Sequence, residues 1–123
     1  MKAADFVTAL CDGKANPGKV TLAFTLALNA LKKGHGATVM LMIEAVELGK
    51  PGAFDDIDIG QPFSPAAELL EAFLAGGGRV AVCRACMINR GFKAEEMAPE
   101  YEIITAADVI DLLMAARGTM QFA

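Results

Sequence analysis

The chain has 123 residues, of which 54% are hydrophobic and 21% are charged. This length fits a single domain over residues 1–123, and the composition excludes a disordered, collagen-like or low-complexity protein. The 11 Lys and Arg against 15 Asp and Glu leave a net charge of −4, so no basic surface is expected for direct binding of nucleic acid.

The apolar stretches are too short to cross a membrane or to direct secretion. The longest uncharged stretch, Val20–Leu31, has 12 residues, whereas a membrane-spanning helix needs about 20. Asp5 and Asp12 bracket the apolar run nearest to Met1, which argues against a signal peptide. Three cysteines cannot form a complete disulfide framework. We therefore expect a cytoplasmic protein with free thiols and no membrane partner.

Short apolar runs alternate with longer helical patterns along the chain. Nearly continuous apolar runs such as ATVMLMI are typical of strands buried on both faces, and apolar residues every three or four positions predict helices. In chain order the predicted elements are a strand at 5–11, a helix at 19–33, a strand at 37–43, a short helical segment at 45–48, a helix at 65–74, a strand at 79–83, a helical turn at 94–97, a strand at 101–104, a helix at 106–117 and an edge strand at 119–122.

This alternation predicts an α/β fold. We expect a three-layer sandwich with a mainly parallel sheet of about five strands and helices on both faces. In the commonest order of such small sheets, the first and third strands are neighbours. At the helix ends, Gly34 is expected to end the first long helix. Ser64 is the expected N-cap of the second, with Pro65 at its first position and Glu68 nearly completing a capping box.

The segment Cys83-Arg84-Ala85-Cys86 is the strongest chemical signal. It follows the third predicted strand, at the carboxyl edge of the sheet where open parallel sheets bind ligands. Two thiols three residues apart can form a disulfide, share a metal, or act as attacking and resolving thiols. Arg84 and Arg90 provide positive charge that would favour the Cys83 thiolate. The alternative is that both cysteines pack as small hydrophobic residues.

The other potential ligands are Cys11 and His35. Cys11 ends the first strand and is expected at the same edge as Cys83, either as a third redox partner or as a buried strand-end residue. His35 lies in the turn 34–36 at the opposite edge, where a solvated side chain is expected. A four-ligand metal site would need both residues beside the Cys pair, so we expect no bound metal. No motif in the sequence indicates an organic cofactor, and none is expected.

Residues 13–19 (GKANPGK) match the phosphate-loop pattern G-x-x-x-x-G-K between a strand and a helix. Val20 stands where a Ser or Thr hydroxyl would hold magnesium, and Pro17 removes one backbone N–H from the loop. Nucleotide hydrolysis is therefore disfavoured.

The segment VAVCRACMINRG at 80–91 resembles the DsrE/DsrF-like family of small sulfur-handling proteins, many of which share a C-x-x-C-M-x-x-R-G segment after a buried strand. The resemblance extends over nearly the whole chain. It implies a flavodoxin-like α/β sandwich that assembles as homotrimers or homohexamers, and a sulfur relay in which a cysteine carries a persulfide. The persulfide-bearing position falls on Cys83. Cys86 departs from the single-cysteine relay subunits, and Cys11 is outside the pattern.

The predicted function is therefore the acceptance and transfer of sulfane sulfur as a persulfide on Cys83, by a sulfurtransferase or persulfide carrier. Cys86 would be the resolving or protecting thiol, and Cys11, Arg84 and Arg90 would complete the site. Expected partners are further copies of the chain, and sulfur donor and acceptor proteins or small persulfides. The alternative is a non-catalytic oligomeric binding or assembly module with structural or metal-binding cysteines. A thiol oxidoreductase ranks third, because the Trp-Cys-x-x-Cys context is missing.

Overall fold

The computed structural model describes all 123 residues and contains five strands, four α-helices and two short 3-10 segments. In chain order they are β1 (Phe6–Leu10), α1 (Pro17–Lys32), β2 (Ala37–Leu41), η1 (Ile43–Gly49), α2 (Ala66–Ala75), β3 (Arg79–Cys83), α3 (Arg84–Asn89), η2 (Ala94–Glu96), β4 (Glu102–Ile104), α4 (Ala106–Ala115) and β5 (Gly118–Phe122). None of the helices combines the length and the apolar character that crossing a bilayer requires.

The five strands form one parallel sheet in the order β4-β3-β2-β1-β5. The predicted contact between the first and third strands is wrong, because β2 lies between β1 and β3. The chain adds β2, β3 and β4 in one direction and then reverses, so that α4 leads to β5 on the other side of β1. The strand order therefore changes direction between β1 and β5.

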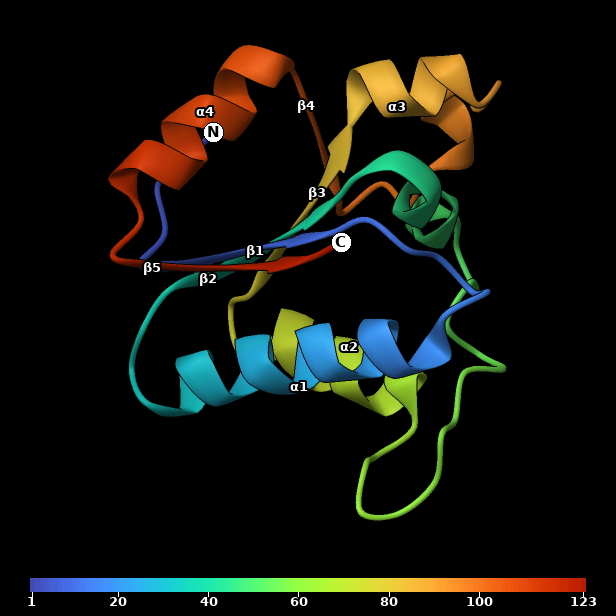
Figure 1. The fold of residues 1–123 in the computed structure, drawn as a ribbon, viewed down its shortest axis with the longest axis vertical. Coiled ribbons are helices and arrows are strands. Elements are labelled where there is room, and N and C mark those ends of the chain that lie inside the picture. The colour runs from blue at the N-terminus through green and yellow to red at the C-terminus, as the bar shows by residue number, and fades with distance from the viewer.

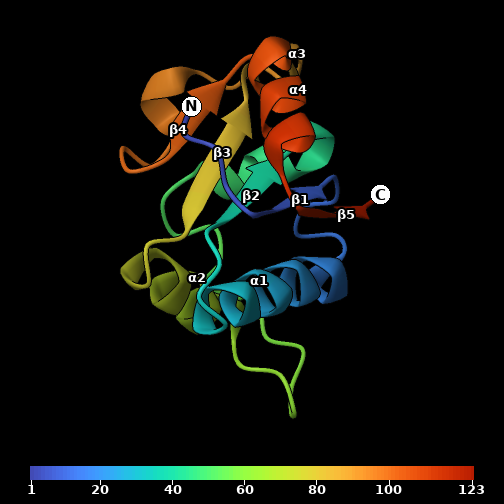
Figure 2. The same cartoon turned by 90° about the vertical axis from the view of Figure 1, so that its left-hand side faces the viewer.

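Helices cover both faces of the sheet, which confirms the three-layer α/β class. In Figure 1, α1 and α2 lie below the sheet and α3 and α4 lie above it. The view in Figure 2, turned by 90°, shows the same separation. Because all strands run in the same direction, their carboxyl ends share one edge, and the turn between β3 and α3 lies at that edge.

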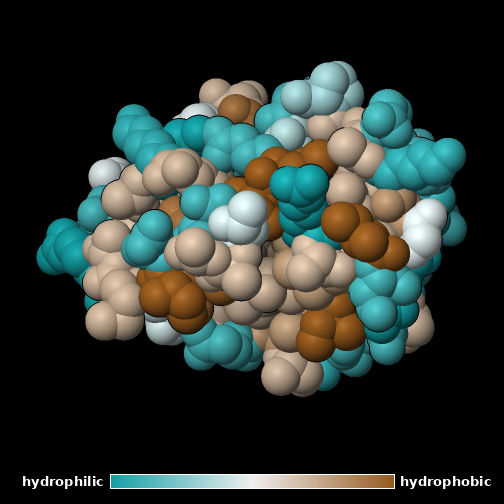
Figure 3. Space-filling model, turned by 90° about the horizontal axis from the view of Figure 1, so that it is seen from above, coloured by the Kyte–Doolittle hydropathy of each residue, from teal (hydrophilic) through white to brown (hydrophobic).

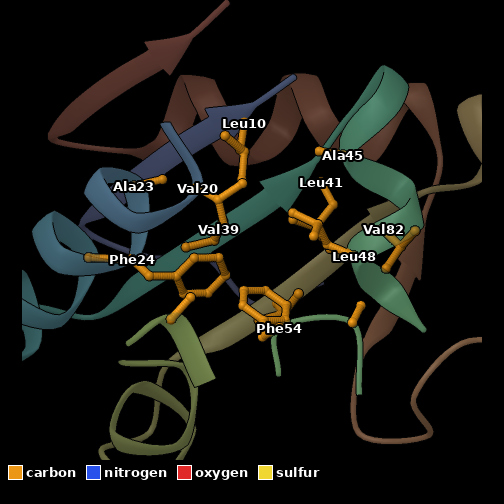
Figure 4. Packing of buried hydrophobic residues seen from close by; sticks show 14 of the residues in the cluster. Leu10, Val20, Ala23, Phe24, Val39, Leu41, Ala45, Leu48, Phe54 and Val82 are labelled. Atoms are coloured by element: carbon orange, nitrogen blue, oxygen red, sulfur yellow. The ribbon is translucent and has the colours of Figure 1, made fainter. Parts of the chain in front are cut away.

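The main core lies between the sheet and the helices α1 and α2. Most of its 23 buried residues come from the three central strands, from α1, η1 and α2 and from the segment between η1 and α2, and the cluster also includes Met87 of α3, Met97 and Phe122 of β5. Phe24 of α1 is fully buried, and its ring meets those of Phe54 and Phe73 edge-on, with centroids 5.1 and 5.7 Å apart. Figure 4 shows Phe24 and Phe54 facing each other beneath Val39 of β2. Edge-on aromatic pairs of this kind stabilise a core beyond the area that they bury.

The opposite face has a smaller core of five buried residues, Val7, Met40, Ala81, Ile104 and Leu112. The outer side of α4 is apolar and uncovered, since Ile110 and Met114 are 58% and 81% exposed. Figure 3 looks onto the face that carries α3 and α4, and hydrophobic atoms are spread between the polar ones. The α4 side of the sheet is thus less completely buried than the α1 side.

Two helix starts differ from the sequence prediction. α1 begins at Pro17, because the Asn16 side chain accepts a hydrogen bond from the Lys19 N–H (3.4 Å) and caps the helix two residues earlier than expected. The predicted capping of α2 by Ser64 is wrong. Pro65 occupies the N-cap position and no side chain caps this helix.

Candidate thiol site

The Cys83–Cys86 pair lies where β3 turns directly into α3. Cys83 is both the last residue of β3 and the N-cap of α3, which has only six residues. Its Sγ atom accepts a hydrogen bond from the backbone N–H of Cys86 at 3.4 Å. A sulfur at this position takes the role that a Ser or Asp oxygen has in an ordinary helix cap. The carboxyl-edge position predicted for the pair is therefore observed.

Cys83 is buried, with 6% of its surface exposed, and belongs to the main core. Burial raises the pKa of its thiol above the ordinary value of 9.0, and the neighbouring Cys86 side chain raises it further. The backbone N–H groups of Cys86 and Ala85 lower this pKa, but they do not outweigh the loss of solvent. Cys83 is consequently protonated at neutral pH in the single chain.

The positive charge predicted to favour the Cys83 thiolate is not among the causes that shift the Cys83 pKa, which rises in this structure. Arg84 occupies the first position of α3 with an exposed side chain. Arg90 lies within 3.8 Å of the carboxylate of Glu44 in η1. Proximity in sequence placed both arginines near the cysteines, but it did not determine the direction of their side chains.

Cys11 lies at the same sheet edge and interacts with Cys86. Burial is the main cause that raises the Cys11 pKa, followed by the negative charges of Asp12 and of the Cys86 thiolate, while Lys19 lowers it. Since β2 separates β1 from β3, Cys11 and Cys83 do not meet through neighbouring strands. All three cysteines are free, with Cys11 and Cys86 half-buried.

A protein carboxylate occupies the loop that resembles a phosphate loop. The backbone N–H of Lys14 donates to Glu47 Oε2 at 2.9 Å, and a Cβ added at Gly13 would lie only 1.8 Å from the same oxygen. Lys19, at the position of the phosphate-loop lysine, binds the Asp12 carboxylate at 2.8 Å. Glu47 was missed from the sequence, because nothing near residues 13–19 indicates that η1 reaches this loop. The loop is thus closed by the chain itself.

His35 lies at the opposite edge of the sheet, as predicted, and its side chain is exposed. Its Nδ1 atom is 3.8 Å from the Asp5 carboxylate. Nowhere in the structure do three or more His, Cys, Asp or Glu side chains converge in a geometry that could hold a metal ion.

The model of the DsrE/DsrF-like family matches residues 1–122 of the chain. The chain belongs to the DsrE/DsrF-like family. Membership suggests a sulfur-relay role in general. No curated protein matches the sequence. The crystal structure of the ychN protein from E. coli is similar to this DsrE/DsrF-like chain, with a TM-score of 0.67 and 19% identity over 99% of this chain and 100% of that one. At this identity the likeness concerns the fold.

Proposed function

We propose that this DsrE/DsrF-like protein accepts sulfane sulfur as a persulfide on Cys83 and passes it on, with Cys86 as the resolving or protecting thiol. The observation that carries the proposal is the contact between the two cysteines, in which Cys83 Sγ accepts the Cys86 N–H at the carboxyl edge of the sheet. Family membership supports sulfur as the cargo. Three free thiols are suited to a reducing compartment, for which we propose the cytoplasm.

The chemistry needs only thiols and a sulfane donor. The Cys83 thiolate attacks the outer sulfur of a persulfide R–S–SH, which forms a Cys83 persulfide and releases R–S⁻. An acceptor thiolate can then attack that outer sulfur, and the Cys83 thiolate leaves. Alternatively the Cys86 thiolate attacks the inner sulfur, which yields a Cys83–Cys86 disulfide and hydrosulfide. An external thiol must reduce this disulfide before the next cycle.

The burial of Cys83 limits when this reaction occurs. A buried, protonated thiol is a poor nucleophile, since the thiolate is the attacking species. We propose that the donor or a neighbouring subunit supplies the base or the positive charge that the single chain lacks. The half-buried Cys86 and the short helix α3 are the parts that would move to open Cys83.

Assembly into a homotrimer or homohexamer is part of the proposal. The uncovered apolar side chains on the α4 side, Ile110 and Met114 foremost, provide a surface that a second copy would bury. Ile88 of α3, on the same face of the sheet as α4, is 61% exposed and lies two residues after Cys86. An interface here would bring a neighbouring subunit close to Cys86.

The burial of Cys83 also favours a second candidate function. In a non-catalytic assembly module, Cys83 would fill the core as a small apolar side chain, and the cysteines would have no chemistry. Replacement of Cys83 by Ala or Val would then leave every activity and the oligomeric state unchanged.

A transfer assay separates the two candidates. The protein is treated with polysulfide, freed of excess reagent, and mixed with cyanide, which takes up sulfane sulfur as thiocyanate. Because Cys86 as a resolving thiol would release the sulfur from Cys83 before cyanide reacts, the assay is made in the Cys86→Ser background. We expect about one thiocyanate per active site from Cys86→Ser and from Cys86→Ser with Cys11→Ser, and none from Cys86→Ser with Cys83→Ser. Equal yields with and without Cys83 would reject Cys83 as the carrier and favour the assembly module.

A further inference from the structure

A cavity of the protein lies at the amino edge of the sheet, away from the cysteines. It has a volume of about 500 Å³ and opens between α1 and the start of β1 and β5. Figure 2 looks at this end, with α1 below the beginnings of β1 and β5. Cavities of this size are in the range that holds small organic ligands.

The cavity combines an apolar floor with a cationic rim. Its apolar residues, Phe6, Leu26, Ala30 and Met120, come from β1, α1 and β5. Lys33 and Arg117 stand at its rim, and neither side chain forms an ion pair.

The acidic and basic groups at the rim do not neutralise one another. Asp5 is the single carboxylate of the lining, and it already accepts the Gly36 N–H at 3.2 Å and faces His35 at 3.8 Å. At the end of α1, the last carbonyl groups accept N–H groups from the turn that follows the helix, and Lys32 lies in the last turn.

Lys33 and Arg117 form no ion pair with any carboxylate, in a protein whose net charge is −4.

We infer that this cavity binds an amphipathic organic anion, with its apolar body on Phe6, Leu26 and Met120 and its carboxylate or sulfonate between Lys33 and Arg117. Unpaired cations beside a concave apolar surface favour a ligand that combines both properties over a purely apolar molecule or an inorganic anion. The site is independent of the proposed sulfur chemistry, since it contains no cysteine and lies at the other edge of the sheet.

The probes for the test share one ring system and differ in charge. Naphthalenesulfonate, neutral naphthylmethanol and inorganic sulfate are titrated into the protein, and binding is followed by amide chemical shifts in two-dimensional NMR. We expect naphthalenesulfonate to shift the amides of residues around Ala30 and Gly118, and to bind at least about fivefold more tightly than either other probe. Naphthylmethanol tests the need for charge, and sulfate tests the need for the apolar body.

Matched variants show which positive charges contribute to the binding of naphthalenesulfonate. Lys33→Gln and Arg117→Gln should each weaken naphthalenesulfonate binding by about three- to fivefold. Lys32→Gln, which removes the neighbouring charge outside the cavity, should leave the affinity unchanged. The dispersion of the amide spectrum verifies that each variant is folded.

Three results would overturn the inference. These are equal affinity for naphthylmethanol, equal loss from Lys32→Gln and Lys33→Gln, or shifts at this edge that depend on protein concentration without ligand. The last would identify the cavity and the edge strand β5 as a contact between copies of the chain. None of them affects the thiocyanate yield, so failure here is distinct from failure of the proposed sulfur transfer.

Discussion

The sulfur of Cys83 accepts the backbone N–H of Cys86 at 3.4 Å, which joins the two thiols of the C-x-x-C segment through the first turn of α3. The same turn buries Cys83 and leaves Cys86 half-exposed. The two cysteines therefore differ in access to solvent although they are only three residues apart.

The alkylation rate of Cys83 should depend steeply on pH. Because burial raises the Cys83 pKa above 9.0, its reaction with iodoacetamide should speed up by about tenfold per pH unit up to at least pH 9. The rate is measured by mass spectrometry of the tryptic peptide Val80–Arg84, which cleavage at Arg84 separates from Cys86. A rate that levels off below pH 8 would show a lowered pKa and contradict the structure.

The pKa of Cys11 should change when the neighbouring charged groups Cys86 and Lys19 are replaced. Because the Cys86 thiolate raises the Cys11 pKa and Lys19 lowers it, Cys86→Ser should lower this pKa and Lys19→Gln should raise it. Alkylation of the tryptic peptide Ala3–Lys14 at several pH values measures both changes. If Cys86→Ser has no effect on Cys11, the two thiols are not close enough to interact.

Gly13→Ala should destabilise the protein, because a Cβ there meets both the Glu47 carboxylate and the Glu44 carbonyl oxygen. Gly13→Ala places a Cβ 1.8 Å from Glu47 Oε2 and 2.9 Å from the Glu44 carbonyl oxygen, and should lower the free energy of unfolding by about 1–3 kcal/mol. Gly18→Ala, whose Cβ has no neighbour closer than 3.9 Å, is the control and should stabilise α1 by up to about 1 kcal/mol.

Urea unfolding followed by circular dichroism measures both variants. A double variant Gly13→Ala, Glu47→Ala should recover part of the loss, because the carboxylate is removed from the loop. Equal stability of Gly13→Ala and the native protein would contradict the close approach of Glu47 and of the Glu44 carbonyl oxygen to Gly13.

Tyr101 should destabilise the protein when it ionises. Burial raises the pKa of Tyr101 from 10.0 to about 12, with a smaller contribution from Glu100. The folded state thus retains the phenolic proton where the unfolded state has lost it. The stabilisation from this group is complete below pH 10 and disappears as the pH rises through about 12.

The chain has one Tyr and no Trp, so the ultraviolet absorbance of tyrosinate reports on Tyr101 alone. We expect a midpoint near 12 in the folded protein and near 10 in urea. In Tyr101→Phe, the fall in stability between these pH values should become less steep. A midpoint near 10 in the folded protein would contradict the burial of the phenol.

The sequence predicted the order and type of nearly all elements, because short apolar runs and helical spacing are local properties of the chain. It did not predict that β2 separates β1 from β3, since strand order depends on which way each crossover turns. The helix α3 directly after Cys83 was not among the predicted elements. Its backbone N–H groups lower the Cys83 pKa, yet burial dominates and the pKa rises.

In the candidate site too, local features were predictable from the sequence, whereas contacts between distant residues were not. The position of the cysteines at the carboxyl edge followed from the end of a strand, which the sequence indicates. The pairing of Arg90 with Glu44 and the contact of Glu47 with the loop at Gly13 join residues more than 30 positions apart. No local pattern encodes contacts of this kind.

Peptide mapping after treatment with polysulfide shows which cysteine takes up the sulfane sulfur. Free and persulfide thiols are capped with iodoacetamide, the protein is digested with trypsin, and the masses of Ala3–Lys14, Val80–Arg84 and Ala85–Arg90 are compared. We expect the mass of one additional sulfur atom on Val80–Arg84, or a disulfide that links this peptide to Ala85–Arg90. Additional sulfur only on Ala85–Arg90 or Ala3–Lys14, or neither additional sulfur nor this disulfide, would contradict transfer through Cys83.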